Sequence, residues 1–420
     1  MKRLTTIRAG RRGASSLAAL MLLAALGSAA GRAEAGFYSI TDLGNLGTSA
    51  PSIGPGTGAG PGFGGGGNIN AGGMVTGYYS YSGGASGFVA NGAPMTSVPS
   101  LGSNFSFAFG INASGQVVGI SGTDAFLYDS STQTLTDLTT TNHVTLGGFT
   151  TQANAINDGG QIAGQARNSG STSQAFLYSG GTTTNLSNLA NGATGYAEAI
   201  NNSGQVTGQQ AFAAGAHAFL YSGGSGAADT GGTMKDLGTI GHSTGASMGY
   251  DINASGLVVG ESNVGNSSTY HAFLYDGTSM VDLFAASDYA GYNSQAFGMN
   301  SNGDIVGVYS GSSSTSFTGT QGYLDSYSNG VYTITDLNSL ISPTSGWTIT
   351  GAYGINDSGQ IDVIANDGTS SHVLLLTAPL LVPEPPTIAL LCSGAVVGLG
   401  LRRFSRRIKA EDLAAEPVAE

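Results

Sequence analysis

Cysteine is almost absent from this chain, since Cys392 is the only one in 420 residues. A single cysteine excludes an intrachain disulfide framework and a cysteine-based metal site, so packing and strand pairing must hold the fold together. Basic side chains are also scarce between the ends: residues 36–381 contain Arg167 and Lys235 against 19 aspartates and glutamates. Such an acidic body cannot neutralise phosphates, so nucleic acid and anionic membrane surfaces are poor partners for it.

A composition suited to helices is lacking as well. Charged residues make up only 9% of the chain, whereas glycine supplies 70 residues. Serine, threonine and asparagine fill most polar positions, and this composition suits short strands joined by tight turns better than helices. With 40% hydrophobic residues the chain can still bury a core. We therefore expect an all-β fold.

The first 35 residues have the layout of a secretory signal peptide. A basic start precedes an apolar run from Leu17 to Leu26, and small residues follow at Ala33 and Ala35. Cleavage is expected after Ala35, and the body is expected to be exported. Arg11-Arg12 leaves a twin-arginine route open, although the flanking GRRGASSL matches that signal poorly.

Residues 382–420 form a second targeting segment. An apolar run over 387–401 has 15 residues, which is short of the roughly 20 that span a bilayer, although flanking arginines can extend it. The basic cluster over 402–409 is expected to stay on the cytoplasmic side. The motif before the run is Pro383-Glu384-Pro385, and the arginines that flank the membrane are Arg402, Arg403, Arg406 and Arg407.

This order of elements resembles the PEP-CTERM sorting signal of exported Gram-negative bacterial proteins, although the acidic tail AEDLAAEPVAE extends beyond the usual end of such signals. The resemblance implies recognition by an exosortase-type membrane enzyme, processing near the Pro-Glu-Pro motif, and transient inner-membrane anchoring by a helix over 387–401. It also implies a mature protein at the outer surface or in an exopolysaccharide-rich matrix. An ordinary tail anchor is the alternative.

A hairpin motif, written AFGINASGQVVG at residues 108–119, occurs seven times between the two signals. Its copies are 42–56 residues apart, a period typical of propellers and solenoids. Each turn asparagine can bond its own backbone two residues on, and the glycine three positions later suits a type I turn or the left-handed site of a bulge. The turn asparagines are Asn70, Asn112, Asn157, Asn201, Asn253, Asn300 and Asn356.

Two further apolar stretches follow the hairpin in most units. The second reads AFLY four times, beginning at residues 125, 175, 218 and 272, and the third has forms such as ITDLNSL at 334–340. With the hairpin counted as two strands, each unit has four strands. Seven such units predict a seven-bladed β-propeller over 36–381.

The seventh unit lacks its fourth strand, and a matching segment stands at the start of the body. FYSITDLGNLG at 37–47 precedes the first hairpin and has no unit of its own. Pairing beside residues 372–376 would complete the last blade and remove the open edge of the array. We therefore expect a closed ring, in which the Gly/Pro-rich residues 51–67 form a mobile linker without a fold.

The strand before each turn has small residues four and two positions ahead of the asparagine, as at Ala108 and Gly110. Strand alternation would place each pair on one face, and we expect this face to line the central axis. Asn68 and Asp251 break the pattern. They are therefore expected to point polar groups into the channel.

The repeats also resemble a known family. AxxINxxGQxxG occurs together with HAFLY at 217–221 and 271–275, and with DLG at 42–44 and 236–238. This combination resembles the HAF-repeat family of bacterial extracellular proteins, which are often joined to PEP-CTERM signals. The resemblance covers residue 37 to about residue 376 and implies a location and a repeat fold, but no reaction.

Chemical motifs in the body are weak. GHSTG at 241–245 fits a G-x-S-x-G nucleophile pattern around Ser243, but it lies in a turn, and one such match is expected by chance in a chain so rich in glycine and serine. Loops that contain Asp304 and Asp357 faintly resemble calcium loops. Simple turn chemistry is the stronger interpretation, because the loops have too few carboxylates.

Two sets of residues raise further alternatives. His217 and His271 hold equivalent places in adjacent units, but neighbouring blades would keep them beyond the reach of one metal ion unless they faced the axis. Asp251, Glu198 and Glu261 could supply an acid and base for glycoside hydrolysis, although nothing in the sequence sets their separation.

We expect no catalytic residue, no metal and no cofactor, with calcium as a weak alternative. The expected function is that of a secreted, non-catalytic repeat protein that builds or binds an extracellular polysaccharide matrix after sorting by an exosortase. Two alternatives stay open: an extracellular glycan-acting hydrolase that uses propeller carboxylates, and a cell-surface adhesin retained by its tail. Carboxylates gathered at one mouth would favour the hydrolase, and scattered ones would argue against it.

Overall fold

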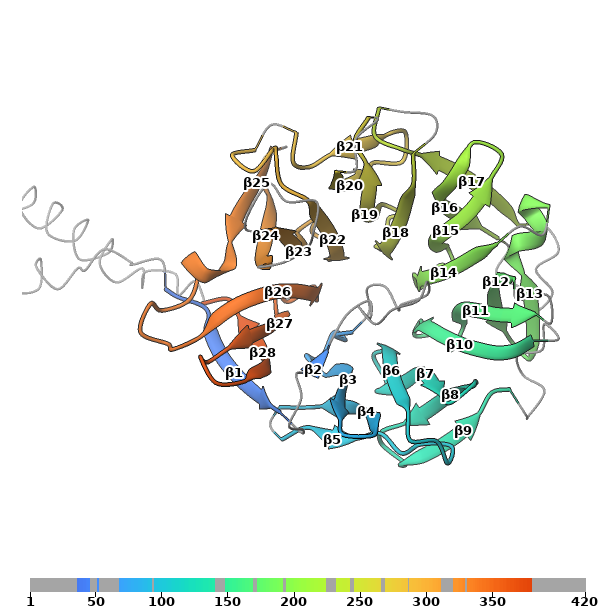
Figure 1. Ribbon diagram of the computed structural model, residues 1–420, viewed down its shortest axis with the longest axis horizontal. Coiled ribbons are helices and arrows are strands. Elements are labelled where there is room, and N and C mark those ends of the chain that lie inside the picture. Colours follow the sequence, from blue (N-terminus) through green and yellow to red (C-terminus); the bar gives the residue numbers. More distant parts are fainter. Residues whose placement is uncertain are drawn as a thin grey trace, which may run out of the picture. The chain divides into compact units, whose positions relative to one another are not determined.

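Seven four-stranded antiparallel sheets are arranged in a ring as the blades of a β-propeller (Figure 1). The predicted all-β class and seven blades are confirmed, and the only helices among the described residues are two short 3-10 turns, Leu186–Ala190 and Leu337–Ser339. All described residues except Pro379 belong to a unit that spans Met1–Ala378. The computed structural model describes residues 36–45, 51–52, 68–92, 94–139, 148–168, 172–191, 194–223, 232–241, 245–265, 269–285, 287–310, 320–328 and 331–379.

Blades 1 to 6 each run from an inner to an outer strand in chain order (Figure 1). Blade 1 contains β2 (Pro51–Ser52), β3 (Val75–Tyr81), β4 (Gly84–Ala90) and β5 (Thr96–Ser97), and blade 2 contains β6 (Ser106–Ile111), β7 (Gln116–Ser121), β8 (Asp124–Asp129) and β9 (Thr134–Asp137). Blade 3 contains β10 (Gly148–Ile156), β11 (Ile162–Asn168), β12 (Ser173–Ser179) and β13 (Thr182–Asn185), and blade 4 contains β14 (Gly195–Ile200), β15 (Val206–Phe212), β16 (Gly215–Ser222) and β17 (Thr233–Gly238). Blade 5 contains β18 (Ser247–Ile252), β19 (Val258–Asn263), β20 (Tyr270–Tyr275) and β21 (Met280–Asp282), and blade 6 contains β22 (Ser294–Met299), β23 (Ile305–Ser310), β24 (Thr320–Ser328) and β25 (Val331–Asp336).

Blade 7 is built from both ends of the described chain. It contains β26 (Thr348–Ile355), β27 (Ile361–Asn366), β28 (Ser371–Thr377) and, as its outer strand, β1 (Ser39–Gly44). The β1–β28 register begins with Ser39 opposite Thr377 and ends with Gly44 opposite Val373. The predicted closure by the N-terminal segment is therefore confirmed.

The start of the predicted linker needs a correction. Pro51 pairs with Tyr79 and Ser52 with Tyr78, so β2 is the inner strand of blade 1. The expectation that residues 51–67 have no fold is therefore wrong for the first two of them. The remaining residues, 53–67, lie outside the described part of the chain.

A β-bulge divides the small-residue pair of the inner strands, so the prediction that both members face the axis is wrong. We number positions from the turn asparagine and find a register shift between positions −4 and −2 in blades 2 to 7. The residue at −4 packs against the preceding blade, as Ala153 does against Val118. The residue at −2 packs against the following blade, as Ala199 does against Phe273. Small side chains are therefore needed between blades.

The bulged residue at −3 contacts its counterparts in neighbouring blades. The ring of Phe297 lies 5.2 Å from that of Tyr250 and 5.4 Å from that of Tyr353. On the other side of the ring of blades, Asn154 Nδ2 donates to Glu198 Oε2 over 3.2 Å. These contacts connect the inner strands of successive blades through their bulged residues. Strand alternation alone does not predict them, because it does not account for the extra residue of a bulge.

Gly298, at position −2 of blade 6, leaves no room for a side chain. A Cβ atom there would lie 2.9 Å from Gly354 Cα on the following blade. We expect Gly298→Ala to lower the free energy of unfolding by about 1–3 kcal/mol, because overpacking forces two backbones apart. Chemical denaturation against Gly291→Ala, where a Cβ would meet nothing within 4 Å, measures the effect. Equal stability of the two variants would contradict the close approach.

Candidate functional site

The turn asparagines organise the hairpins that join the first and second strands of each blade. In blade 4, Asn201 Oδ1 accepts from the backbone N–H groups of Ser203 and Gln205, both over 3.0 Å. Its Nδ2 donates to Gln205 Oε1 over 2.8 Å. The glycine at +3 has a φ between 72° and 90° in all seven turns. The left-handed bulge site predicted for this glycine is therefore confirmed.

The same asparagine side chains also join the blades in a circle, which we name the asparagine belt. In six blades, Nδ2 donates to the backbone oxygen of the turn asparagine in the following blade over 3.0–3.4 Å. The bonds run from Asn70 to Asn112, Asn112 to Asn157, Asn157 to Asn201, Asn201 to Asn253, Asn300 to Asn356 and Asn356 to Asn70. The repeated motif therefore serves both the turn and the ring.

The belt is interrupted between blades 5 and 6. Asn253 Oδ1 accepts from Ser255 and Leu257, as a turn requires, but its side chain makes no bond to Asn300 in the described structure. Leu257 stands four positions after the asparagine, where blades 2, 3, 4 and 7 have a glutamine that accepts from the asparagine side chain. The asparagine of this blade therefore lacks both the glutamine and the inter-blade bond.

Asp251 bridges this interruption. Its Oδ2 accepts from the backbone N–H of Met299 in blade 6 and its Oδ1 from that of Ile252, both over 2.8 Å. Burial raises the pKa of Asp251 to about 6, although both bonds favour the charged form. A cavity lies inside the asparagine belt, and we name it the mouth cavity. Neither Asp251 nor Asn68, which is buried, is among its described lining residues.

We expect Asn201→Ala to lower the free energy of unfolding by about 3 kcal/mol, because it leaves buried backbone groups of two blades without partners. Asn253→Ala is the matched control, since Asn253 makes the turn bonds without the belt bond. It should lose roughly 1–3 kcal/mol less, the net value of the two hydrogen bonds, to the glutamine and to the next blade, that Asn201 makes and Asn253 does not. Urea titrations of both variants measure the difference, and an equal loss would remove the belt from the account of stability.

The mouth cavity has a volume of about 260 Å³ and is lined by turn residues from all seven blades. Isoleucines such as Ile111 form its apolar part, and no basic side chain is among its described lining residues. At the edge, Asn202 Nδ2 donates to Asp158 Oδ2 over 2.8 Å, and Asp357 accepts from Ser301 N and Oγ over 2.8 and 3.0 Å. Amide, hydroxyl and carboxylate groups over an apolar floor suit a hydroxyl-rich, uncharged ligand.

Histidines in the third strands of blades 4, 5 and 7 are hydrogen-bonded to aspartates in the fourth strands. Each pair fastens the third strand of a blade to the fourth, and in blade 7 the aspartate comes from β1. A metal shared between His217 and His271 has no support in this arrangement, because each has its own carboxylate, and the described residues contain no group of three or more metal-binding side chains. The pairs are His217 with Asp236, His271 with Asp282 and His372 with Asp42, at 2.9–3.0 Å.

The carboxylates considered for glycoside hydrolysis lie on the first or second strand of their blades and accept hydrogen bonds there. Glu261 accepts from the Tyr250 hydroxyl over 2.9 Å and from Gln295 Nε2 over 2.7 Å, and burial raises its pKa. Glu198 is fully buried and accepts from Asn154. With Asp251 in the blade 5–6 bridge, none of the three is among the described residues that line the mouth cavity.

The other sequence candidates serve turns or lie outside the structure. Asp304 stands four positions after Asn300, where four other blades have a glutamine. It accepts from Asn300 Nδ2 over 3.0 Å and from Tyr327 N over 3.2 Å. Asp357 accepts from Ser301, as described above. Ser243 lies outside the described residues.

Two buried carboxylates were not predicted. Asp325 on β24 and Asp362 on β27 are both 0% exposed, and their carboxylate oxygens have no hydrogen-bond partner in the described structure. Burial raises the pKa of Asp325 to about 7 and that of Asp362 to about 8. The sequence indicated both. Asp325 stands where four repeats have the tyrosine of AFLY, and Asp362 stands where other repeats have an apolar or small residue.

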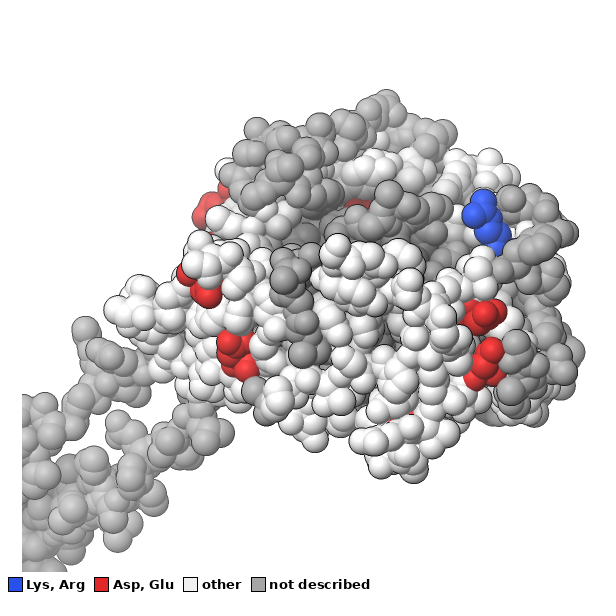
Figure 2. Space-filling view, turned by 60° about the horizontal axis from the view of Figure 1, so that its bottom comes forward, with Lys and Arg blue, Asp and Glu red and all other residues white. Residues whose placement is uncertain are grey.

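The face of the protein drawn in Figure 2 shows isolated acidic groups on a surface that is mostly uncharged where it is described. Asp158 and Asp357 are the carboxylates among the described residues that line the mouth cavity. The predicted signal peptide and the whole 382–420 segment lie outside the described residues. No described helix is long and apolar enough to cross a bilayer.

No protein-family profile matches the chain, and no curated protein matches it. Solved structures are similar only at low identity. An extracellular domain assigned to a one-component system from B. thetaiotaomicron shares 12% identity, covers 81% of this chain and 40% of that one, and has a TM-score of 0.45. TolB from Acinetobacter baumannii shares 16% identity over 70% of this chain and 59% of that one, with a TM-score of 0.38. The chain thus spans less than two thirds of either protein.

Proposed function

We propose that this chain is an exported, non-catalytic propeller that binds neutral polysaccharide at the mouth cavity and acts in an extracellular matrix. The observation that carries the proposal is the cavity itself, which has amide, hydroxyl and apolar groups and no basic side chain among its described lining residues. A sugar offers hydroxyl groups to the amides and hydroxyls of the lining, and a weakly polar ring face to its apolar part. The acidic body and the export signal predicted over residues 1–35 agree with this location.

Sorting by an exosortase-type enzyme is part of the proposal and rests on the Pro383-Glu384-Pro385 motif, the apolar run and the arginines after it. The enzyme would hold the chain transiently at the inner membrane and release the propeller to the surface of a Gram-negative cell. A cell-surface adhesin retained by its tail is the alternative. Fractionation separates the two, because the proposal expects the protein outside the membrane fraction and expects Glu384→Gln to shift it into membranes.

The binding test uses the full-length chain on an array of neutral, amino and acidic polysaccharides, with and without Ca²⁺. Ala113 and Ala254 are exposed turn residues at the mouth cavity. Replacing either by tryptophan should block the cavity and weaken binding at least tenfold. Ala214→Trp is the matched control, because Ala214 is exposed in the turn between β15 and β16, at the opposite end of its blade. Binding that survives both mouth variants would contradict the proposed site.

A further inference from the structure

The third strand of blade 6 departs from the repeat at three positions, of which the last places a carboxylate in the strand. Four blades read AFLY in this strand, but blade 6 reads GYLD over 322–325. In the ladders, Asp325 lies opposite Ile305 as Tyr275 lies opposite Val258 in blade 5. Asp325 therefore occupies the place of a tyrosine.

That tyrosine normally fills the space between two blades. Tyr221 is fully buried and packs with Leu177 and Leu186 of the preceding blade, and Tyr275 packs with Ala218 and Leu237 in the same way. An aspartate is much smaller and has no ring to fill this space. The replacement therefore leaves the interface between blades 5 and 6 without the tyrosine ring that fills it in other blades.

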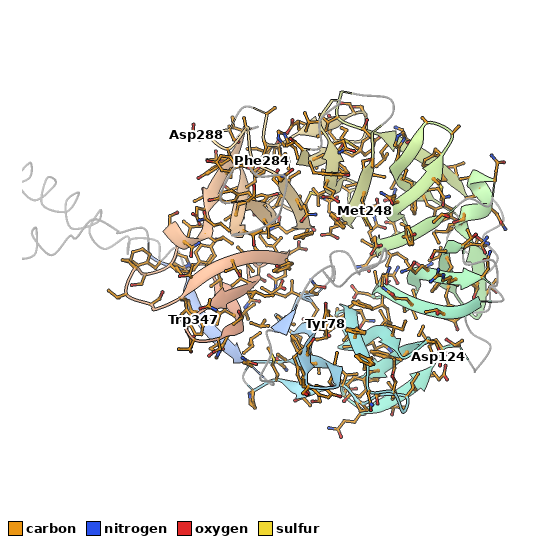
Figure 3. All side chains as sticks on the ribbon, viewed as in Figure 1. Tyr78, Asp124, Met248, Phe284, Asp288 and Trp347 are labelled. Carbon is orange, nitrogen blue, oxygen red and sulfur yellow. The ribbon has the colours of Figure 1, made fainter. Side chains whose placement is uncertain are left out.

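A cavity of about 440 Å³ lies at this interface, between β21 and β25, and we name it the blade 5–6 pocket. Figure 3 shows Asp288 at the outer edge of the ring and Phe284 closer to its centre, which places the pocket near the rim. A volume of this size is in the range of small-molecule sites. Its lining includes Asp282, Ser287, Asp288, Tyr289, Asp325 and Tyr332.

The carboxylate of Asp325 is the unusual group in this pocket. It is 0% exposed, and neither oxygen has a hydrogen-bond partner in the described structure. A buried carboxylate without partners is costly, because it loses its hydration and gains no hydrogen bond in return. The cost is recovered if a ligand supplies both the donors and the opposite charge.

Other lining groups favour a cation over an anion. Asp282 and Asp288 add negative charge, and no basic side chain is among the described lining residues. A metal ion does not fit, because no three metal-binding side chains come together among the described residues. Tyrosine rings attract ammonium groups through their faces and pack on the apolar face of a sugar.

We propose that the blade 5–6 pocket binds a protonated amine carried on a sugar ring, such as a hexosamine unit, with Asp325 as the partner of the ammonium group. The inference rests on the proposed function for the polymer context, whereas the pocket and its charge are independent of the mouth cavity. An ammonium group offers three donors to the two free oxygens of Asp325. Tyr289 and Tyr332 flank the sugar ring.

Binding should strengthen as the pH rises toward 7 and weaken again where the amine of the ligand loses its own proton. Burial and the charge of Asp304 raise the pKa of Asp325 to about 7, so the empty pocket holds a largely protonated carboxyl below this pH. An ammonium ligand favours the charged form and must displace that proton. The titratable groups around Asp325 are Asp282 and Asp288 at β21 and its following loop, Asp304 in the β22–β23 turn, Tyr323 on β24, Tyr289 and Tyr332.

Calorimetry on the full-length chain tests the proposal with glucosamine oligomers, their N-acetylated counterparts, a linear polyamine and Ca²⁺ alone. The glucosamine oligomer should bind at least tenfold more tightly than the acetylated one, and more tightly at pH 7 than at pH 5.5. Asp325→Asn should lose at least tenfold affinity and most of this pH dependence. Asp325→Tyr, which restores the repeat, should abolish binding and raise the thermal midpoint.

Asp362→Asn is the matched control, because it removes an equally buried carboxylate that is absent from the described lining of the pocket. It should bind the glucosamine oligomer like the wild type. Equal binding of acetylated and free amino sugars, equal binding of the linear polyamine, or binding of Ca²⁺ alone would each overturn the assignment. Neutral polysaccharide binding that persists in Asp325→Asn and is lost in Ala113→Trp would leave the proposed function intact, so the two failures can be told apart.

Discussion

Deletion of residues 36–45 is expected to open the propeller and abolish its cooperative unfolding transition. The deletion removes Leu43, which is fully buried with Phe88 and Val373 between blades 7 and 1. It also removes the Asp42 partner of His372 and the whole β1–β28 ladder. The uncovered β28 would present a row of unpaired backbone groups to other chains, so we expect aggregation.

Size-exclusion chromatography and a thermal scan followed by circular dichroism measure this effect. A synthetic peptide of residues 36–45, added during refolding, should restore the monomer and the transition. The same peptide with Leu43→Asp is the control and should fail, because a charge at a fully buried position is strongly disfavoured. A monomeric deletion variant with an unchanged unfolding midpoint would show that the asparagine belt closes the ring without β1.

Stability is expected to increase as the pH falls from 8 to 5. Asp251, Asp325 and Asp362 have pKa values of about 6, 7 and 8 in the folded protein, well above the ordinary value of 3.8. The folded state therefore holds these protons more tightly than the unfolded chain does. The stability is fully present below pH 4 and is lost as the pH rises to each folded pKa. One pKa difference of this kind is worth about 1.4 kcal/mol per unit, so differences of about 2, 3 and 4 units give a total loss on the order of 10 kcal/mol.

Asp362→Asn isolates the largest of these contributions. The amide has nearly the same shape and carries no charge, so the variant should be more stable than the wild type at pH 8 by a few kcal/mol. Below pH 4, where the wild-type carboxyl is protonated in both the folded and the unfolded state, the two proteins should be nearly equal. Urea titrations at both pH values measure the difference. A wild type that loses stability between pH 8 and pH 5 would contradict the burial of charged carboxylates.

The architecture could be predicted from the sequence because the same strand and turn pattern occurs seven times. Asn112 and its counterparts set the period, and the match between ITDL at 40–43 and at 334–337 identified the closing strand before any pairing was seen. The bulge was not readable, because strand alternation gives no sign of an extra residue. For this reason Ala108 and Gly110 were assigned to one face, although they pack against different blades.

The site was only partly predictable. Asp251 was singled out because it replaces a small residue, but its partner Met299 is 48 residues away and comes close only when blades 5 and 6 are side by side. Asp325 carried a similar signal in GYLD. Its meaning depends on the space that the missing tyrosine leaves, and a sequence does not show empty space.

The pairing of Ser39 with Thr377 means that the ring has no necessary starting point. The two ends of the propeller are neighbours on adjacent strands, so a short turn could join them and the chain could begin in a connection between any two blades. A circularly permuted protein of this kind should fold to the same ring, with its closing pair moved to another blade. Which repeat is called the first is therefore a property of the gene, and the folded molecule does not distinguish it.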